Sequence, residues 1–279
     1  MANDHGADGT FVSGLPARVL VATLACVRSL GAQAPTVPAH VTFTVDSRSL
    51  GERRTINVYT PPKYRQSSKR AFAVLYMPDG GVAEDFPHVV ITVDSLIRLQ
   101  RIAPMLVVGI ENTERRRDLT GPTAVALDSA IAPHVGGSAL FRDFIRDELM
   151  PEIRRRYRTR SETAIVGESL AGLFIVETFL NEPTLFRRYI ALSPSVWWNR
   201  EALLADAAAR LRTGAMRGRT LYLSAANEEG IAPGTAKLAA ILQRSAPAGL
   251  TWYYAPRPDL QHNTIYLGQG PTALLRALR

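Results

Sequence analysis

Residues 164–180 constrain the fold more than any other stretch, because a short apolar run there meets a tight turn and then a helix-like pattern. Residues 164–166 are typical of a β-strand, and apolar side chains recur at helical spacing from 170 to 179. The turn between them, over residues 167–171, reads Gly-Glu-Ser-Leu-Ala. A strand, a sharp turn and a helix with Ser169 at the apex predict a nucleophile elbow, which exposes the serine hydroxyl above a sheet.

This turn departs from the common form of the motif, G-x-S-x-G, because its fifth position is Ala171 and glycine follows only at 172. A serine between a strand and a helix is also frequently an N-cap. On the motif alone, a catalytic Ser169 and a capping Ser169 are equally open. The order of the remaining elements has to decide between them.

Strand patterns and helix patterns alternate along most of the chain. Residues 41–46 and 54–60 alternate in polarity and predict an antiparallel hairpin. This order predicts an α/β fold with a mostly parallel central sheet, the hairpin at its N-terminal side and helices on both faces. Later strands are predicted at 72–77, 104–110, 189–192, 220–224 and 250–254, and helices at 89–102, 139–157 (kinked at Pro151), 200–211, 235–243 and 273–278.

The chain divides into an N-terminal segment over residues 1–36 and a single α/β domain over residues 37–279. Residues 18–26 resemble a short signal-peptide core, although Arg28 interrupts the apolar run, so we expect either an exported protein or, with an uncleaved extension, a cytoplasmic one. The single cysteine, Cys26, excludes an internal disulfide framework and a cysteine-based metal site. No apolar stretch reaches the roughly 18 residues of a membrane span.

The formal net charge of +8 is carried almost wholly by arginine. The densest basic run, residues 154–160, follows a helical pattern and has few aromatic residues within it. We therefore interpret it as a solvated helix end and expect no nucleic-acid partner. We also expect no metal and no cofactor.

A catalytic serine needs a base, and the base needs an orienting acid. In this type of fold the order is serine, acid after a late strand, and histidine after the last strand. Of the five histidines, only His262 follows the last predicted strand. Glu229 is our first choice of acid and Glu228 the alternative, since both end the strand at 220–224, and Asp259 stays open.

We expect two backbone N–H groups to form the oxyanion hole. Leu170 opens the helix after Ser169, and Gly81 lies in the Asp-Gly-Gly turn that ends the strand at 72–77. Backbone donors need no particular side chain, so this assignment rests on position. The alternative is that the glycines only form a tight turn.

With these residues in place, the chain resembles the putative-esterase family of the α/β-hydrolase superfamily, which includes carboxylesterases, esterase D-type enzymes and siderophore trilactone esterases. The resemblance covers about residues 40–279. It implies an α/β-hydrolase fold and a Ser/His hydrolase whose second oxyanion donor follows the Asp-Gly pair. Many relatives have His at position 168 and Gly at position 171, where this chain has Glu168 and Ala171. The motifs that carry the resemblance lie at residues 75–80, 107–112 with 117–120, 148–151 with 157–159, 167–173 and 193–199.

The expected activity is hydrolysis of a small-molecule carboxylic ester with a short-to-medium acyl or an aryl group. Trp197 and Trp198 are expected to wall the substrate pocket, although one of them could instead pack in the core. Arg117 and Glu111 are further candidates for substrate contact. The alternatives are a siderophore trilactone esterase that uses the arginines at 115–117 as anion contacts, or a non-catalytic exported binding module. The sequence does not indicate an oligomeric state.

Overall fold

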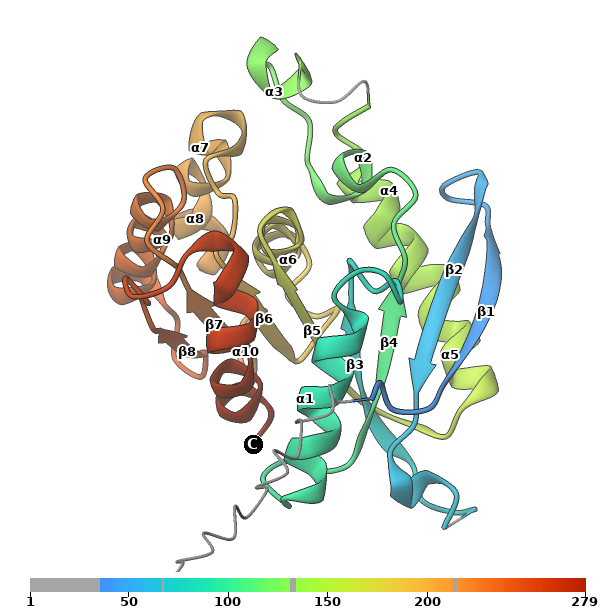
Figure 1. The fold of residues 1–279 in the computed structure, drawn as a ribbon. Coiled ribbons are helices and arrows are strands. Elements are labelled where there is room, and N and C mark those ends of the chain that lie inside the picture. The colour runs from blue at the N-terminus through green and yellow to red at the C-terminus, as the bar shows by residue number, and fades with distance from the viewer. Residues whose placement is uncertain (1–35, 67, 131–133, 213–214) are drawn as a thin grey trace, which may run out of the picture. The chain divides into compact units, whose positions relative to one another are not determined.

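The structure is a computed structural model that describes residues 36–66, 68–130, 134–212 and 215–279. An eight-stranded sheet with the order β1-β2-β4-β3-β5-β6-β7-β8 forms its centre (Figure 1). β2 is antiparallel to both of its neighbours, and the remaining pairs are parallel. The strands are β1 (His40–Ser47), β2 (Glu52–Tyr59), β3 (Phe72–Met77), β4 (Met105–Ile110), β5 (Thr159–Glu168), β6 (Arg188–Leu192), β7 (Thr220–Ser224) and β8 (Thr251–Tyr254). The predicted fold class is therefore confirmed, including the N-terminal hairpin.

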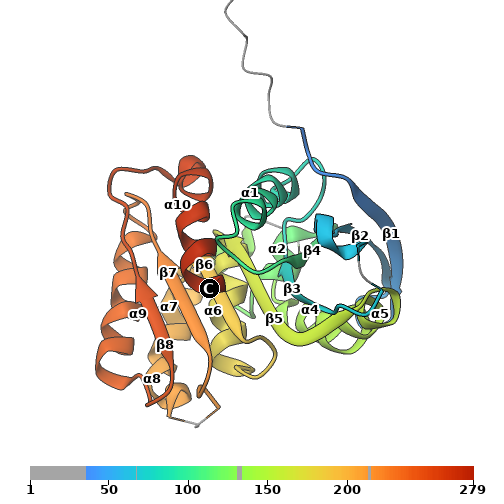
Figure 2. The ribbon, with the colours of Figure 1, turned by 90° about the horizontal axis from the view of Figure 1, so that it is seen from below.

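Helices cover both faces of the sheet, and each face has its own hydrophobic cluster. On one face, α1 and α10 pack side by side over the central strands (Figure 2). On the other face, α6 packs against β5 and β6 and shares its cluster with α4, α5, α8 and α9. The helices are α1 (Phe86–Arg98), α2 (Arg115–Leu119), α3 (Ala126–Ala130), α4 (Ser138–Asp143), α5 (Met150–Arg156), α6 (Leu170–Asn181), α7 (Trp198–Ala205), α8 (Ala207–Leu211), α9 (Ala232–Ser245) and α10 (His262–Leu278).

The helix predicted over 139–157 is interrupted, as the proline in it requires. α4 and α5 are joined by a π-helical segment, Phe144–Leu149, and Pro151 lies in the first turn of α5. Proline has no N–H to donate to the preceding turn, so the regular hydrogen-bond ladder cannot run through it. The buried face is nevertheless continuous, because Phe141, Phe144 and Ile153 all lie in the core.

The last helix is much longer than the predicted 273–278. α10 begins at His262 and contains Gly268, Gly270 and Pro271, which hide it in the sequence. A Cβ at Gly268 would lie 2.8 Å from the Leu260 side chain, so a larger residue there would require Leu260 to shift. His262 is consequently the first residue of a helix, not a residue of a loop.

The remaining segments also differ in detail from the predictions. Residues between the strand predicted at 104–110 and the helix predicted at 139–157, for which no helix was predicted, contain the short helices α2 and α3. The helix predicted over 200–211 consists of α7 and α8, and residues Asn199–Glu201 near its start have left-handed backbone angles. The division at residue 36 stays a prediction, because residues 1–35 lie outside the described residues.

Candidate active site

The turn between β5 and α6 has the backbone conformation of a nucleophile elbow. Ser169 has φ 60° and ψ −119°, a region in which non-glycine residues are strained. Its N–H donates to the Leu192 carbonyl at 3.0 Å, which ties the turn to β6. Its side chain makes no capping hydrogen bond to α6, so the capping interpretation is wrong. A Cβ on Gly167 would lie 2.6 Å from the Cβ of Ala171, which explains why this turn requires glycine two residues before Ser169.

Ser195 supports the elbow and was missed in the sequence. Its hydroxyl lies 3.5 Å from the Ser169 hydroxyl, and its N–H donates to the Ser169 carbonyl at 3.0 Å. Ser195 is buried. The sequence signals were its place in the motif at 193–199 and its position just after β6, whose carboxyl end meets that of β5 at the same edge of the sheet.

His262 lies at the same edge, at the start of α10. Gln261 and Thr264 form a capping box that fixes this helix end. The His262 Nδ1 atom lies 2.6 Å from Glu228 Oε2 and 3.8 Å from Glu168 Oε1. The first contact is short enough for a hydrogen bond, although the N–H is not directed at the oxygen. Because Glu168 directly precedes Ser169, these contacts bring the imidazole to the elbow.

The carboxylate next to His262 is Glu228, our second choice, and not Glu229. Glu228 is itself held in place, because the Ser193 hydroxyl donates to its Oε1 at 2.9 Å. Glu229 is exposed. Asp259, the third candidate, forms a bidentate ion pair with Arg257 at 2.6 and 2.8 Å. The geometry therefore favours Glu228 as the acid.

The two predicted oxyanion donors differ in their present contacts. Leu170 is the first residue of α6, where backbone N–H groups have no acceptor within the helix. The Gly81 N–H instead donates to Glu84 Oε2 at 2.7 Å, and Asn112 Nδ2 donates to the other oxygen of Glu84 at 2.9 Å. The Glu84 carboxylate thus occupies the place at the Gly81 N–H where an oxyanion would bind.

Glu168 is a largely buried acid beside the candidate nucleophile. Burial raises its pKa to about 8, helped by the negative charges of Asp85 and Glu228, while Arg115 acts in the opposite direction. Arg115 lies nearby but gives both nitrogens of its guanidinium edge to Asp79, at 2.7 and 2.8 Å. A neutral carboxyl group is accordingly expected at position 168 near pH 7.

The residues predicted to contact substrate have mostly structural contacts. Trp198 is buried and its Nε1 donates to the Gly121 carbonyl at 2.8 Å, so it is the tryptophan that packs in the core. Trp197 is half-buried, with its ring centre 5.9 Å from that of Trp198. The Glu111 carbonyl accepts from Arg54 at 2.9 Å, while its side chain lies next to Gly81.

Arg117 belongs to a buried ion cluster. Its guanidinium contacts Glu52 and Asp118, each at 2.7 Å. Asp118 also contacts Arg54 at 2.5 Å, and the side chains of both these residues are fully buried. The guanidinium of Arg117, a predicted substrate contact, is therefore engaged in structural ion pairs with Asp118 and Glu52.

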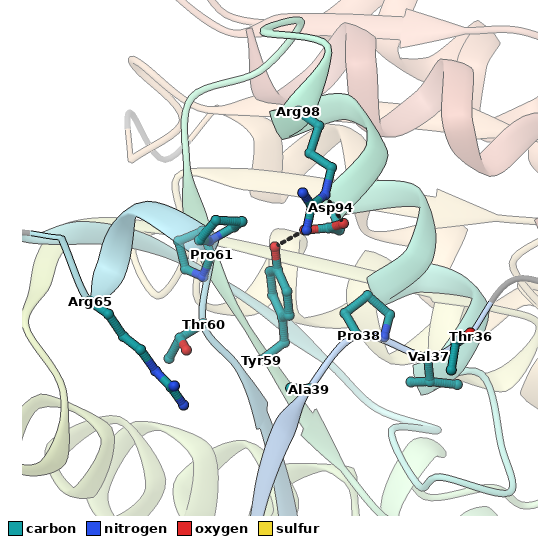
Figure 3. Close-up of a pocket in the computed structure, with 11 residues that line it drawn as sticks. Thr36, Val37, Pro38, Ala39, Tyr59, Thr60, Pro61, Arg65, Asp94 and Arg98 are labelled. Atoms are coloured by element: carbon teal, nitrogen blue, oxygen red, sulfur yellow. Dashed lines mark hydrogen bonds and ion pairs between the residues drawn. The ribbon is translucent and has the colours of Figure 1, made fainter.

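The cavity in Figure 3, of about 480 Å³, lies away from this site. It opens between β2, α1 and residues 36–39, and its lining does not include Ser169 or His262. The Tyr59 hydroxyl donates there to Asp94 at 2.6 Å (Figure 3).

Within the described ranges, no three or more His, Cys, Asp or Glu side chains are arranged to hold a metal ion. No helix in that same part of the chain is both long and apolar enough to cross a membrane.

Comparisons with known proteins identify relatives over most of the described chain. Residues 47–234 match the family described as "Putative esterase". The ferri-bacillibactin esterase BesA of Bacillus subtilis is 31% identical over 189 residues, which are 61% of this chain and 63% of that protein. The iron(III) salmochelin esterase of Escherichia coli is 28% identical over 54% of this chain and 34% of its own length. The chain thus spans less than two thirds of the length of these curated relatives.

Solved structures give the same fold. An IroE-like serine hydrolase from Shewanella oneidensis superposes with a TM-score of 0.77 at 27% identity, covering 85% of this chain and 79% of that one. The BES protein from Bacillus cereus has a TM-score of 0.75 at 21% identity, covering 88% of this chain and 97% of that one. The second likeness supports the fold alone.

Proposed function

The chain belongs to the family described as "Putative esterase", and we propose that it is a carboxylic-ester hydrolase with Ser169 as nucleophile, His262 as base and Glu228 as acid. One observation carries this proposal. His262 lies 2.6 Å from Glu228 and 3.8 Å from Glu168, the residue before a serine in the elbow conformation. Such a group can activate a serine hydroxyl, which is otherwise a weak nucleophile.

The reaction proceeds through an acyl-enzyme. The Ser169 hydroxyl attacks the ester carbonyl carbon while His262 accepts its proton, giving a tetrahedral oxyanion. Collapse of this intermediate breaks the bond to the alcohol oxygen, which takes the proton from His262. Water then attacks the acyl-serine with His262 again as base, and the carboxylic acid leaves as Ser169 recovers its proton. Glu228 stabilises the His262 imidazolium during both acylation and deacylation.

The oxyanion would be stabilised by the N–H groups of Leu170 and Gly81. The positive end of the α6 dipole lies at Leu170 and supports the first donor. The second donor requires the Glu84 side chain to leave Gly81, because one N–H cannot serve both acceptors well. Exchange of this carboxylate for the substrate oxygen is therefore part of the proposed binding step.

The substrate is proposed to be a small ester with a short-to-medium acyl or an aryl group. A second candidate is a siderophore ester, because two curated relatives are named as esterases of ferri-bacillibactin and iron(III) salmochelin. The anion contact expected from Arg115 and Arg117 is weakened by their ion pairs with Asp79, Glu52 and Asp118. Comparing the hydrolysis rates of p-nitrophenyl butyrate and a catecholate trilactone would separate the two candidates.

We propose no nucleic-acid partner for the basic run at residues 154–160. Arg155 and Arg156 both pair with Glu152, at 2.7 and 2.5 Å, so part of the positive charge is already matched on α5. These side chains lie at a solvated helix end.

We also propose that the protein is exported. The mass of the N-terminal peptide of the protein recovered from its host would show whether the N-terminal segment is cleaved.

The activity is tested with Ser169→Ala and His262→Ala on p-nitrophenyl acetate and butyrate. Both variants should lose turnover by roughly 10³-fold or more while their circular dichroism spectra stay unchanged. Glu228→Gln should be clearly impaired, and Glu229→Gln, its matched control, should behave as the wild type. Turnover that survives in folded Ser169→Ala would reject the proposal, and a worse defect in Glu229→Gln would reject the choice of acid.

A further inference from the structure

Two carboxylates face the same nitrogen of His262. Glu228 Oε2 lies 2.6 Å and Glu168 Oε1 lies 3.8 Å from Nδ1. They come from different parts of the sheet, since Glu228 follows β7 and Glu168 ends β5 directly before Ser169. A triad needs only one acid. Glu168 is thus a titratable group at the site for which the proposed mechanism has no role.

The group near Glu168 that can take up a positive charge is the His262 imidazole. Its side chain is only 15% exposed, so solvent screens it weakly. Arg115, whose charge lowers the pKa of Glu168, is committed to Asp79 by two hydrogen bonds. An ionised Glu168 would therefore interact electrostatically mainly with the His262 imidazole. The charged and titratable groups around it are Asp79, Asp85, Arg115, Glu228, His262 and Tyr266.

We propose that Glu168 is a second positioning residue for His262, which stabilises the imidazolium together with Glu228 when Glu168 is ionised. This inference rests on the proposed Ser169–His262 mechanism and extends it. The geometry supports it, because both carboxylates approach Nδ1 and leave Nε2 for the serine proton. No additional bond forms or breaks, since Glu168 acts through its charge.

The proposal makes activity depend on the protonation of Glu168. Burial, then the charges of Asp85 and Glu228, raise the pKa of Glu168 to about 8, so it is mostly neutral at pH 7 and ionised at pH 9. An added negative charge at 3.8 Å from the imidazole favours its protonated form. We expect kcat/KM to rise by on the order of tenfold as Glu168 ionises.

The test is the pH profile of kcat/KM for p-nitrophenyl acetate between pH 5 and 10, corrected for uncatalysed hydrolysis and read at the isosbestic wavelength of nitrophenol. The wild type should show this rise near pH 8, and Glu168→Gln should lack it. Glu228→Gln should regain activity only as Glu168 ionises. The double variant should lose that recovery, and Glu229→Gln should keep the wild-type profile.

Two results would overturn the proposal. One is a Glu168→Gln profile that superimposes on the wild type, and the other is a Glu228→Gln defect that is equal at all pH values. The Glu228→Gln measurement does not depend on whether Glu168→Gln folds. Failure of the underlying function is distinguishable, because active Ser169→Ala would reject the mechanism, whereas inactive Ser169→Ala with an unchanged Glu168→Gln profile rejects only the role of Glu168.

Discussion

Removal of the buried charge of Asp118 tests whether the arginines at 115–117 are structural. Asp118 accepts from Arg54 at 2.5 Å and from Arg117 at 2.7 Å, and its side chain is fully buried. Asp118→Asn would leave the equally buried Arg54 without its closest negative charge. Breaking a buried pair from one side costs about 3–5 kcal/mol. Glu52 still contacts both arginines, at 2.8 and 2.7 Å, so we expect the lower end, about 3 kcal/mol.

Urea unfolding monitored by circular dichroism measures this loss as a lower midpoint at an unchanged m-value. In a domain of this size the melting temperature should fall by about 6–12 °C. Asp46→Asn is the matched control, because Asp46 pairs with Arg53 at 2.7 Å on the same hairpin but both side chains are largely exposed. It should change the midpoint little. A small loss in Asp118→Asn with a raised KM would refute the structural role and restore Arg117 as a substrate contact.

Three further variants follow from the described contacts. Glu84→Gln should raise kcat several-fold, because a neutral amide competes less well with the oxyanion for the Gly81 N–H; a lower kcat at unchanged stability would contradict this. Tyr59→Phe should cost about 1.5 kcal/mol in urea unfolding, because Asp94 loses a buried donor, and should leave kcat/KM unchanged; reduced turnover would count against the separation of this cavity from the site. Burial alone would raise the pKa of Glu52, but its hydrogen bonds, foremost from Arg117, lower it to about 2, so its contribution to stability is present above pH 4.5 and lost towards pH 2. Glu52→Gln should therefore flatten the loss of stability in that range, and an unchanged slope would show that other groups cause it.

The sequence predicted the architecture because strand and helix periods dominate it. Residues 72–77 and 104–110 are continuous apolar runs, and both form buried strands of the parallel sheet. The elbow conformation at Ser169 could be predicted from the strand, turn and helix around it, and the position of His262 at the same edge of the sheet from its place after the last strand. Their catalytic roles stay a prediction.

The carboxylate that faces His262 could not be predicted from the sequence, because Glu228 and Glu229 are neighbours after the end of one strand. Their difference is tertiary: the Ser193 hydroxyl, which follows β6, binds Glu228 and turns it towards His262. The start of α10 was missed for a related reason. The burial of Ile265 in the core and the capping box before it offset the low helix propensity of the glycines that follow.

The contact between Glu84 and Gly81 also could not be predicted from the sequence pattern. A backbone donor is visible in a sequence only as a position, and its acceptor depends on which rotamer a nearby side chain adopts. Asn112, from the end of β4, fixes that rotamer by donating to Glu84. Long-range contacts of this kind decide whether an oxyanion donor is available.

The nucleophile itself is tested most directly by labelling the intact protein with a fluorophosphonate and mapping the adduct by peptide mass spectrometry. We expect one stoichiometric adduct on Ser169, which His262→Ala slows strongly and Ser169→Ala abolishes. An adduct on another residue, or ester hydrolysis that continues after complete labelling of Ser169, would contradict it.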